Sequence, residues 1–220
     1  VTLLPNFENV CSEITIYTRF MEAPKSASLS KQRSFPMSRI TYPSSIAAAP
    51  GASQPLLQAV EKQLGSVPNL FRLASVSPAA LEGYLGIFGA LGKGRLPAAT
   101  RERIALAVAQ ANGCNYCLSA HTYLGKNLAK LDAAEIAANR AGRSNDVKAD
   151  AAVRFAVRVL NARGRVAASD LNEIRDAGYD DGQIIEIVQH VALNIWTNYL
   201  NELAQTEIDF PKIDAAEIAA

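Results

Sequence analysis

The chain has 220 residues, a length that suits one domain, or one domain with a tail, and leaves too little sequence for two large domains. Hydrophobic residues make up 49% of it and charged residues 20%, so the chain can bury a core and should fold as a globular protein. Because 22 Lys and Arg balance 21 Asp and Glu, the net charge of +1 creates no field that would recruit nucleic acid or an anionic membrane.

Residues 1–36 differ in character from the rest of the chain. They mix short apolar and polar runs and then become rich in Ser, Lys, Arg and Pro, which is typical of an extension or linker. We therefore predict a poorly ordered N-terminal extension over 1–36 and a helical domain over 37–220, with the functional protein beginning near Met37. Cys11 lies in the extension and is interpreted as an incidental thiol.

Helical periodicity runs through the chain from Ser53 onward, and no alternating run of β-branched residues predicts a strand. The fold class should be all-α, with about seven or eight helices. Ser53, Ser77, Asp132 and Ser144 are the expected N-terminal caps, and Gly113 is expected to end a helix in the left-handed conformation. The expected helices span about 53–65, 77–92, 98–112, 115–129, 132–142, 144–164, 169–177 and 181–205.

The last predicted helix is the longest and has a wide apolar surface. Its first stripe consists of Ile184, Val188, Val191, Ile195 and Tyr199, and its second of Ile185, Ala192, Trp196, Leu200 and Leu203. Such width indicates burial on two sides, which a core position or a subunit interface would each explain, and a homo-oligomer is expected. His190, Trp196 and Tyr199 are interpreted as packing residues.

The cysteine usage and the lack of targeting signals indicate a cytoplasmic protein. Three cysteines are too few, and odd in number, for a disulfide-stapled secreted domain. Glu8 and Glu13 interrupt any apolar signal region. The uncharged stretches 40–60 and 187–201 contain prolines or polar residues, so neither is expected to span a membrane.

Two of the 3 cysteines and one of the 2 histidines fall within one short stretch, Cys114-Asn115-Tyr116-Cys117-Leu118-Ser119-Ala120-His121. Cys117 would lie in the first turn of a helix, where unpaired N–H groups and the helix dipole stabilise a thiolate. His121 lies one turn further on, so its imidazole can accept the thiol proton or pair with the thiolate. Cys114 is placed to form a disulfide once either sulfur is oxidised, and Glu102 could orient the histidine.

Glu102, Cys114, Cys117 and His121 stand in the order Glu-x11-Cys-x2-Cys-x3-His. This order resembles the signature of alkylhydroperoxidase D-like (AhpD-like) proteins in the carboxymuconolactone decarboxylase superfamily. The surrounding residues are similar to its peroxidase-related branch, from about Met37 to the C-terminus. They are Arg101-Glu102, Val108-Ala109-Gln110-Ala111-Asn112-Gly113-Cys114, Tyr116-Cys117-Leu118-Ser119-Ala120-His121-Thr122, Thr197-Asn198-Tyr199-Leu200-Asn201 and Ile208-Asp209-Phe210-Pro211.

The resemblance implies an oligomeric thiol peroxidase or disulfide oxidoreductase that uses no cofactor and no metal. It implies that Cys117 is peroxidatic, that Cys114 is resolving and more exposed, and that His121 and Glu102 form a proton relay. The substrate would be a hydroperoxide, and a dithiol or protein reductant would reset the disulfide. The best-known form of the site has a histidine where this chain has Tyr116, a phenol that titrates near pH 10, so the relay should run through water or more slowly.

Other interpretations of the same residues stay open. Cys114 and Cys117 could be small buried core residues beside a core histidine, or they could join His121 and Glu102 in a zinc site. The lactone decarboxylation that names the superfamily is the alternative enzymatic activity, although it does not require a cysteine pair. A non-catalytic module whose thiols sense oxidant is the last alternative.

Overall fold

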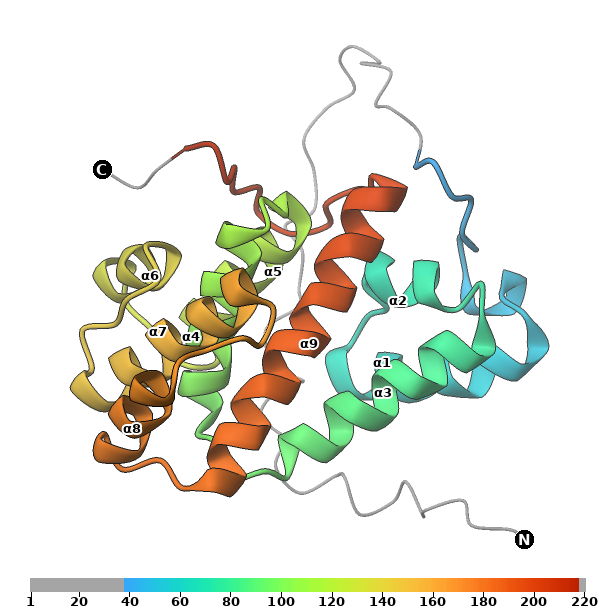
Figure 1. The fold of residues 1–220 in the computed structure, drawn as a ribbon. Helices are drawn as coiled ribbons and strands as arrows, with labels where there is room; N and C mark the ends of the chain where they lie inside the picture. The colour runs from blue at the N-terminus through green and yellow to red at the C-terminus, as the bar shows by residue number, and fades with distance from the viewer. Residues whose placement is uncertain (1–37, 218–220) are drawn as a thin grey trace, which may run out of the picture. The chain divides into compact units, whose positions relative to one another are not determined.

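The computed structural model describes residues 38–217 of the chain (Figure 1). The predicted extension over 1–36, Cys11 and the proposed start at Met37 lie outside the described residues. The chain divides into two compact units, Val1–Leu85 and Gly86–Ala220, with the boundary inside one helix.

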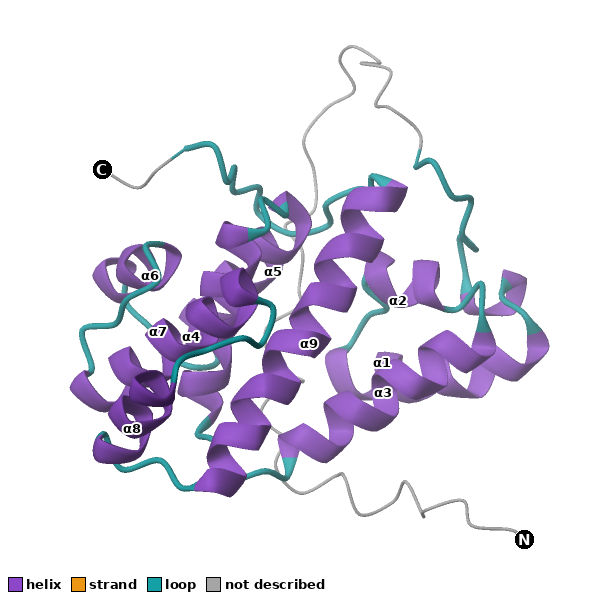
Figure 2. Ribbon diagram, viewed as in Figure 1, coloured by secondary structure: helices purple, strands orange, loops and turns teal. Residues whose placement is uncertain are grey.

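The described residues form helices and loops and contain no strand, so the predicted all-α class is confirmed (Figure 2). The α-helices within this part of the chain are α1 (Gln54–Leu64), α2 (Asn69–Ala74), α3 (Pro78–Gly92), α4 (Ala98–Ala111), α5 (Asn115–Asn127), α6 (Ala133–Arg140), α7 (Val147–Ala162), α8 (Ala168–Asp176) and α9 (Asp181–Ala204). Two short 3-10 helices, Ile46–Ala48 and Gly51–Ser53, precede them. None of the described helices is long and apolar enough to cross a membrane.

The first unit contains α2, a helix that the sequence pattern did not predict. It has only 6 residues, and its buried Leu70, Phe71, Leu73 and Ala74 span too short a stretch for helical periodicity to be recognised. Pro68 stands at its N-cap, where a proline is compatible with a helix start. The apolar interior of this unit includes Leu57, Val60, Leu70, Phe71, Leu73 and Leu81.

Ser53 does not cap α1, contrary to prediction. Its backbone is already helical because a 3-10 turn runs directly into α1, so its side chain makes no capping bond. The buried hydroxyl instead donates to the carbonyl of Ser75 at 2.8 Å. The predicted cap at Ser77 is confirmed, since its hydroxyl accepts from the amide of Ala80 at 3.3 Å.

The second unit is built around α4, which contacts α5, α6, α7 and α9. Because neighbours pack on several sides of α4, its residues from Ile104 to Ala109 are all buried and show no single apolar stripe. The main core cluster joins α4 to α7, α8 and α9 and includes Ile104, Val108, Ala152, Phe155, Ile174, Ile187 and Val191. Because α4 contacts both α5 and α9, it positions these two helices relative to each other.

The start of α7 differs from the prediction. Ser144 was the expected cap, but Asp146 caps the helix by accepting from the amide of Ala149 at 2.7 Å. Ser144 lies before the helix and donates its hydroxyl proton to Glu135 at 2.5 Å. The predicted cap of α6 is confirmed, because Asp132 accepts from the amide of Glu135 at 2.7 Å.

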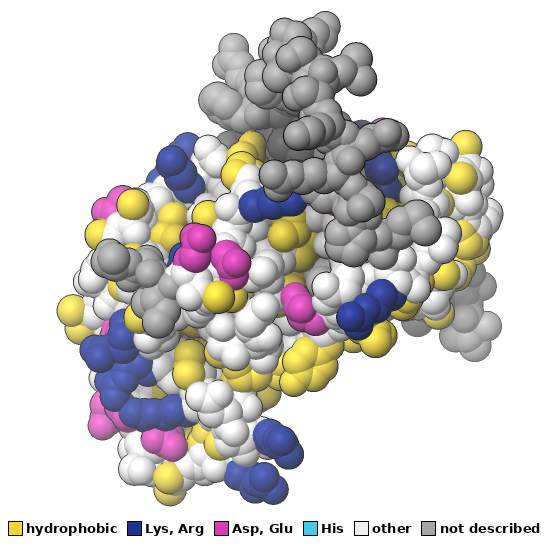
Figure 3. Space-filling model, turned by 90° about the horizontal axis from the view of Figure 1, so that it is seen from above, with side chains coloured by type: hydrophobic (Ala, Val, Ile, Leu, Met, Phe, Trp, Pro, Cys, Tyr) yellow, Lys and Arg dark blue, Asp and Glu magenta, His cyan; other side chains and the backbone are white. Residues whose placement is uncertain are grey.

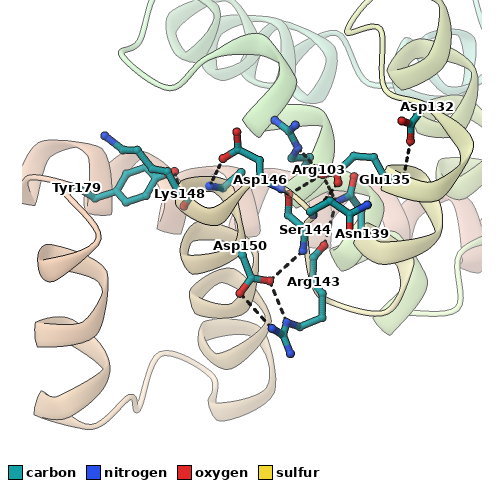
Figure 4. Close-up of polar contacts among 12 residues, drawn as sticks. Arg103, Asp132, Glu135, Asn139, Arg143, Ser144, Asp146, Lys148, Asp150 and Tyr179 are labelled. Carbon is teal, nitrogen blue, oxygen red and sulfur yellow. Dashed lines mark hydrogen bonds and ion pairs between the residues drawn. The ribbon is translucent and has the colours of Figure 1, made fainter.

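Glu135 ties α4, α6 and the α6–α7 loop together (Figure 4). Its carboxylate accepts from Arg103 at 2.6 Å, from Asn139 at 2.9 Å, and from the Asn145 amide at 2.7 Å, in addition to Ser144. Burial alone would raise the pKa of Glu135, but these donors outweigh it and lower the pKa to about 2. The carboxylate is therefore ionised and fully engaged, which fits a structural role.

Only part of the wide apolar surface predicted for α9 is buried within this unit. Ile184 and Val191 are buried, but Val188 and Tyr199 on the same predicted stripe are 42% and 61% exposed. The face that packs inward carries polar residues as well as apolar ones, so hydrophobicity did not mark all of it. The buried polar residues of α9 are His190, Asn194, Thr197, Asn198 and Asn201.

Charge on the surface is mixed. The face presented in Figure 3 carries both basic and acidic side chains among uncharged ones, where the described residues are visible. This distribution fits the near-zero net charge of the sequence.

Candidate functional site

A sharp turn between α4 and α5 places the cysteines. Gly113 has a φ of 67°, so it takes the left-handed conformation predicted for it and lets α5 begin directly after α4 ends. Cys114 is the N-cap of α5, and its sulfur accepts from the amide of Cys117 at 3.5 Å. The two cysteines therefore share one helix terminus, and the backbone amide of Cys117 is bonded to the side chain of Cys114.

Cys117 lies in the first turn of α5 with only 2% of its surface exposed. Its sulfur accepts from Nδ2 of Asn201, which reaches it from α9 at 3.3 Å. The hydrogen bond from Cys114 lowers its pKa most, burial opposes this, and the charge of His121 and the amides of Asn201 and Asn198 lower it further, to about 6. Cys117 is therefore the thiol that ionises near neutral pH.

Cys114 is fully buried, with 0% of its surface exposed. The expectation that it is the more exposed of the two thiols is wrong for this chain, because both lie inside the packed helices. Its hydrogen bond to Cys117 and its burial both raise its pKa. The pair is thus asymmetric: Cys114 keeps its proton and supplies a hydrogen bond to Cys117.

The structure brings Glu102 of α4 and His121 of α5 together, with His121 Nδ1 and Glu102 Oε2 separated by 2.9 Å. Their side chains are 22% and 21% exposed, so the pair reaches the surface of the unit. Burial lowers the pKa of His121, but attraction to Glu102, with a smaller contribution from Cys117, more than offsets this and raises it overall. Protonated His121 can therefore pair with both Glu102 and the Cys117 thiolate.

Tyr116, which was expected in or beside the proton relay, is buried and packs its ring edge-on against Phe210, with centroids 5.9 Å apart. The contact fixes the phenol ring in place from the C-terminal side of the chain. A part for Tyr116 in a proton relay remains a prediction.

The segment 206–217 after α9 returns to the start of α5 (Figure 1). The amide of Ile213 donates to the hydroxyl of Ser119 at 2.9 Å, and the amide of Ala215 donates to Oδ1 of Asn115 at 2.8 Å. These bonds hold the segment along the turn of helix that contains both cysteines.

Two residues near Cys117 were not predicted as functional. Asn198 and Asn201 appeared only as part of a similar sequence stretch, and they lie more than 80 residues from Cys117 in sequence. A helical wheel of α9 places them on one face, but no local signal shows that this face meets a cysteine. Only the packing of α9 against α5 reveals the contact.

His190 is buried on the same face of α9 and its Nε2 has no hydrogen-bond partner. Burial lowers its pKa to about 4, with smaller contributions from Arg101 and His121. It is therefore neutral near pH 7, which agrees with its interpretation as a packing residue.

Regarding the zinc alternative, the residues described by the structure include no group of three or more His, Cys, Asp or Glu placed to hold a metal ion.

The sequence matches the model of the Carboxymuconolactone decarboxylase family over residues 78–162, a range that contains Glu102, Cys114, Cys117 and His121. No curated protein matches the chain. The predicted resemblance to the AhpD-like proteins of the carboxymuconolactone decarboxylase superfamily is confirmed by this match and by the fold.

Solved structures share the fold. The alkylhydroperoxidase AhpD core of a peroxidase-related protein from Ralstonia eutropha JMP134 has a TM-score of 0.71 and 24% identity, covering 80% of this chain and 94% of that one. A peroxidase-related protein from Silicibacter sp. TM1040 has a TM-score of 0.68 and 21% identity, covering 81% and 95%. The debrominase Bmp8, whose Cys-to-Ala variant was crystallised with 2,3,4-tribromopyrrole, has a TM-score of 0.64 and 20% identity, covering 78% and 94%.

Proposed function

We propose that this protein is a thiol peroxidase and disulfide oxidoreductase that reduces a hydroperoxide through Cys117 and Cys114. The observation that carries the proposal is the position of Cys117, whose sulfur lies in the first turn of α5 and accepts from Asn201 Nδ2 at 3.3 Å. These surroundings lower its pKa and favour the thiolate. A thiolate beside a second thiol and a histidine–carboxylate pair is the set of groups that two-step peroxide reduction requires.

In the first step, the Cys117 thiolate attacks the terminal oxygen of the hydroperoxide. The S–O bond forms as the O–O bond breaks, and two electrons pass from sulfur to the peroxide. Protonated His121 gives its Nε2 proton to the departing alkoxide, which leaves as an alcohol, while Glu102 holds the ring through Nδ1. Cys117 is left as a sulfenic acid.

In the second step, the sulfur of Cys114 attacks the sulfur of Cys117. The S–S bond forms as the S–O bond breaks, and the Cys114 proton leaves with the hydroxide as water. An external dithiol then returns two electrons and two protons, becomes a disulfide itself and restores both thiols. We propose a cytoplasmic setting, where such reductants are available.

We also propose that the protein forms a homo-oligomer through the outer side of α9. Ile185 and Leu203 are 69% and 62% exposed there, and large apolar side chains along one helix face favour association. The resemblance to the AhpD-like proteins also implies an oligomer, although it does not identify the interface.

The decisive experiment is mass spectrometry of Cys114→Ser and Cys117→Ser after one equivalent of tert-butyl hydroperoxide. Sulfenic acid should be trapped on Cys117 in the Cys114→Ser protein, and the wild-type protein should form the disulfide. Sulfenic acid on Cys114 in the other variant would reverse the two roles. Lack of reaction in every protein would overturn the peroxidase proposal.

Turnover separates an enzyme from an oxidant sensor. With excess dithiothreitol, an enzyme consumes many equivalents of hydroperoxide, whereas a sensor is oxidised and reduced without comparable catalytic turnover. A decarboxylating lyase would act on its lactone equally well in the Cys114→Ser and Cys117→Ser proteins, because that reaction does not need the pair.

Reductive dehalogenation is a second candidate, favoured by the likeness of the fold to a debrominase crystallised with a brominated pyrrole. Assaying 2,3,4-tribromopyrrole in parallel, with bromide release as the readout, distinguishes it from peroxide reduction.

A further inference from the structure

The inner face of α9 is unusual for a core helix because its buried residues near α5 are polar. Burying a polar side chain is costly unless it finds a hydrogen-bond partner. Two of these residues satisfy themselves within the helix: Asn194 Nδ2 donates to the carbonyl of His190 at 2.8 Å, and Thr197 Oγ1 donates to the carbonyl of Asn194 at 3.0 Å. Asn198 and Asn201 instead direct their amides outside their own helix.

Asn201 directs its amide at the reacting sulfur. Its Nδ2 donates to Cys117 Sγ at 3.3 Å, and its Oδ1 is buried without a partner. Sulfur of a neutral thiol is a weak acceptor, whereas a thiolate is a charged one that roughly doubles the strength of such a bond. The contact therefore favours the ionised form of Cys117 over the neutral form.

Asn198 is oriented by a second amide. Its Oδ1 accepts from Nδ2 of Asn112 at 2.8 Å, which turns its own Nδ2 away from Asn112. That Nδ2 is buried and has no hydrogen-bond partner at normal geometry. The amide of Asn198 also lowers the pKa of Cys117, so this unused buried donor is expected to gain a partner when the sulfur carries a charge, or an oxygen after oxidation.

We propose that Asn198 and Asn201 form an amide cradle that holds the Cys117 thiolate and so selects this sulfur, rather than Cys114, as the nucleophile. The two cysteines are almost equally buried, so burial does not distinguish them. Both amides lower the pKa of Cys117, and neither is among the groups acting on Cys114. Because amides do not titrate, the cradle acts at every pH, whereas His121 contributes its charge only when protonated.

The role of Cys117 as nucleophile rests on the proposed function, but the effect of the amides on its ionisation can be tested without it. In the Cys114→Ser background, the ionisation of Cys117 is followed directly by thiolate absorbance near 240 nm, without any peroxide. Asn201→Leu removes the donor at similar volume, and Asn198→Leu does the same for the second amide. Asn194→Leu is the matched control, since it makes the same substitution on the same buried face away from the sulfur.

Asn201→Leu and Asn198→Leu should each raise the Cys117 pKa, by about one unit for Asn201, because a hydrogen bond to a charged group is lost. At the pH where Cys117 is half ionised in the Cys114→Ser background, a shift of one unit lowers the thiolate fraction about fivefold. Asn194→Leu should leave the pKa unchanged. If a Leu variant does not fold by circular dichroism, Asn201→Ser and Asn198→Ser replace it.

Unchanged Cys117 titration in folded Asn201 and Asn198 variants overturns the cradle. Equal shifts in the Asn194→Leu control also overturn it, because the effect would then reflect general loosening of α9. If the Asn variants shift the Cys117 pKa but the wild-type protein does not turn over hydroperoxide, the cradle is retained and the peroxidase proposal is rejected. If the wild-type protein turns over hydroperoxide but the Asn variants leave the Cys117 pKa unchanged, the peroxidase proposal is retained and the cradle is rejected.

Discussion

Nδ1 of His121 lies 2.9 Å from Oε2 of Glu102, which joins α5 to α4 beside the cysteine pair. Because Nδ1 faces a carboxylate, its proton is held there and Nε2 is the nitrogen left for chemistry. The same carboxylate outweighs burial and raises the pKa of His121. Glu102 is thus a positioning residue that controls both the orientation and the charge of the histidine.

Glu102→Gln should lower the pKa of His121, because an amide cannot stabilise the imidazolium while burial still opposes its charge. With less positive charge beside it, Cys117 should show a higher pKa. The measurement is NMR titration of the ring protons, which is simple because the chain has 2 histidines. The charge of His121 also lowers the pKa of His190, so His190 is not an independent reference. Glu61→Gln, an exposed substitution on α1, is the control in which the His121 titration should not change. An unaltered His121 titration would contradict the role given to Glu102.

The alkylation rate of Cys117 should follow its thiolate. With a pKa of about 6, the relative rate with iodoacetamide should be half-maximal near pH 6 and about tenfold below its plateau at pH 5. Cys114 should stay largely unmodified over this range, because its pKa is raised. Peptide mass spectrometry reports the two sites separately. If the alkylation rate of Cys117 is half-maximal near pH 8 to 9, as for an ordinary thiol, the prediction is wrong.

Release of the segment 206–217 should make Cys114 more accessible. Asn115→Ala with Ser119→Ala removes both side-chain acceptors of the segment, at about 1 kcal/mol each, so the opened population should rise about tenfold to thirtyfold. Cys114 should then be alkylated faster by a similar factor under denaturant-free conditions. Asn127→Ala, elsewhere on α5, is the control. Equal Cys114 rates in both proteins would show that the segment does not limit access.

Much of the fold follows from local signals in the sequence. Asp132 and Gly113 mark a helix start and a helix end because a capping carboxylate and a left-handed glycine act within a few residues. The prediction of Ser144 as the cap of α7 was wrong because Asp146, two residues further on, caps equally well. The hydroxyl of Ser144 donates instead to Glu135, a contact that the local sequence does not show. Competition between nearby caps is decided by tertiary contacts.

The candidate site also has a part that local sequence signals predict and a part that depends on tertiary contacts. Cys114, Cys117 and His121 were placed together by helix spacing alone, since one turn of α5 contains or adjoins them. The burial of Cys114 and the contact from Asn201 depend on α9, more than 80 residues away, packing on α5. A polar residue on a helix gives no local sign that it will meet a sulfur.

Glu135→Gln should destabilise the second unit in a pH-dependent way. The folded-state pKa is lowered from 4.5 to about 2, so the ionised carboxylate adds stability that is fully present above pH 4.5 and is lost as the pH falls toward 2. At pH 7 the loss should be about 3 kcal/mol in the free energy of unfolding, since the charge that holds Arg103 and the α6–α7 loop is gone. Urea denaturation at pH 7 and at pH 3 measures it.

The difference between wild type and Glu135→Gln should shrink as the pH is lowered, because protonation of the wild-type carboxylate removes the same charge. Glu61→Gln on α1 is the matched control: the side chain is exposed, and its substitution should change stability by less than about 0.5 kcal/mol at either pH. A pH-independent loss in Glu135→Gln would mean that shape, rather than charge, stabilises the junction. Stability equal to wild type at pH 7 would show that the carboxylate network contributes nothing to holding α4, α6 and the loop together.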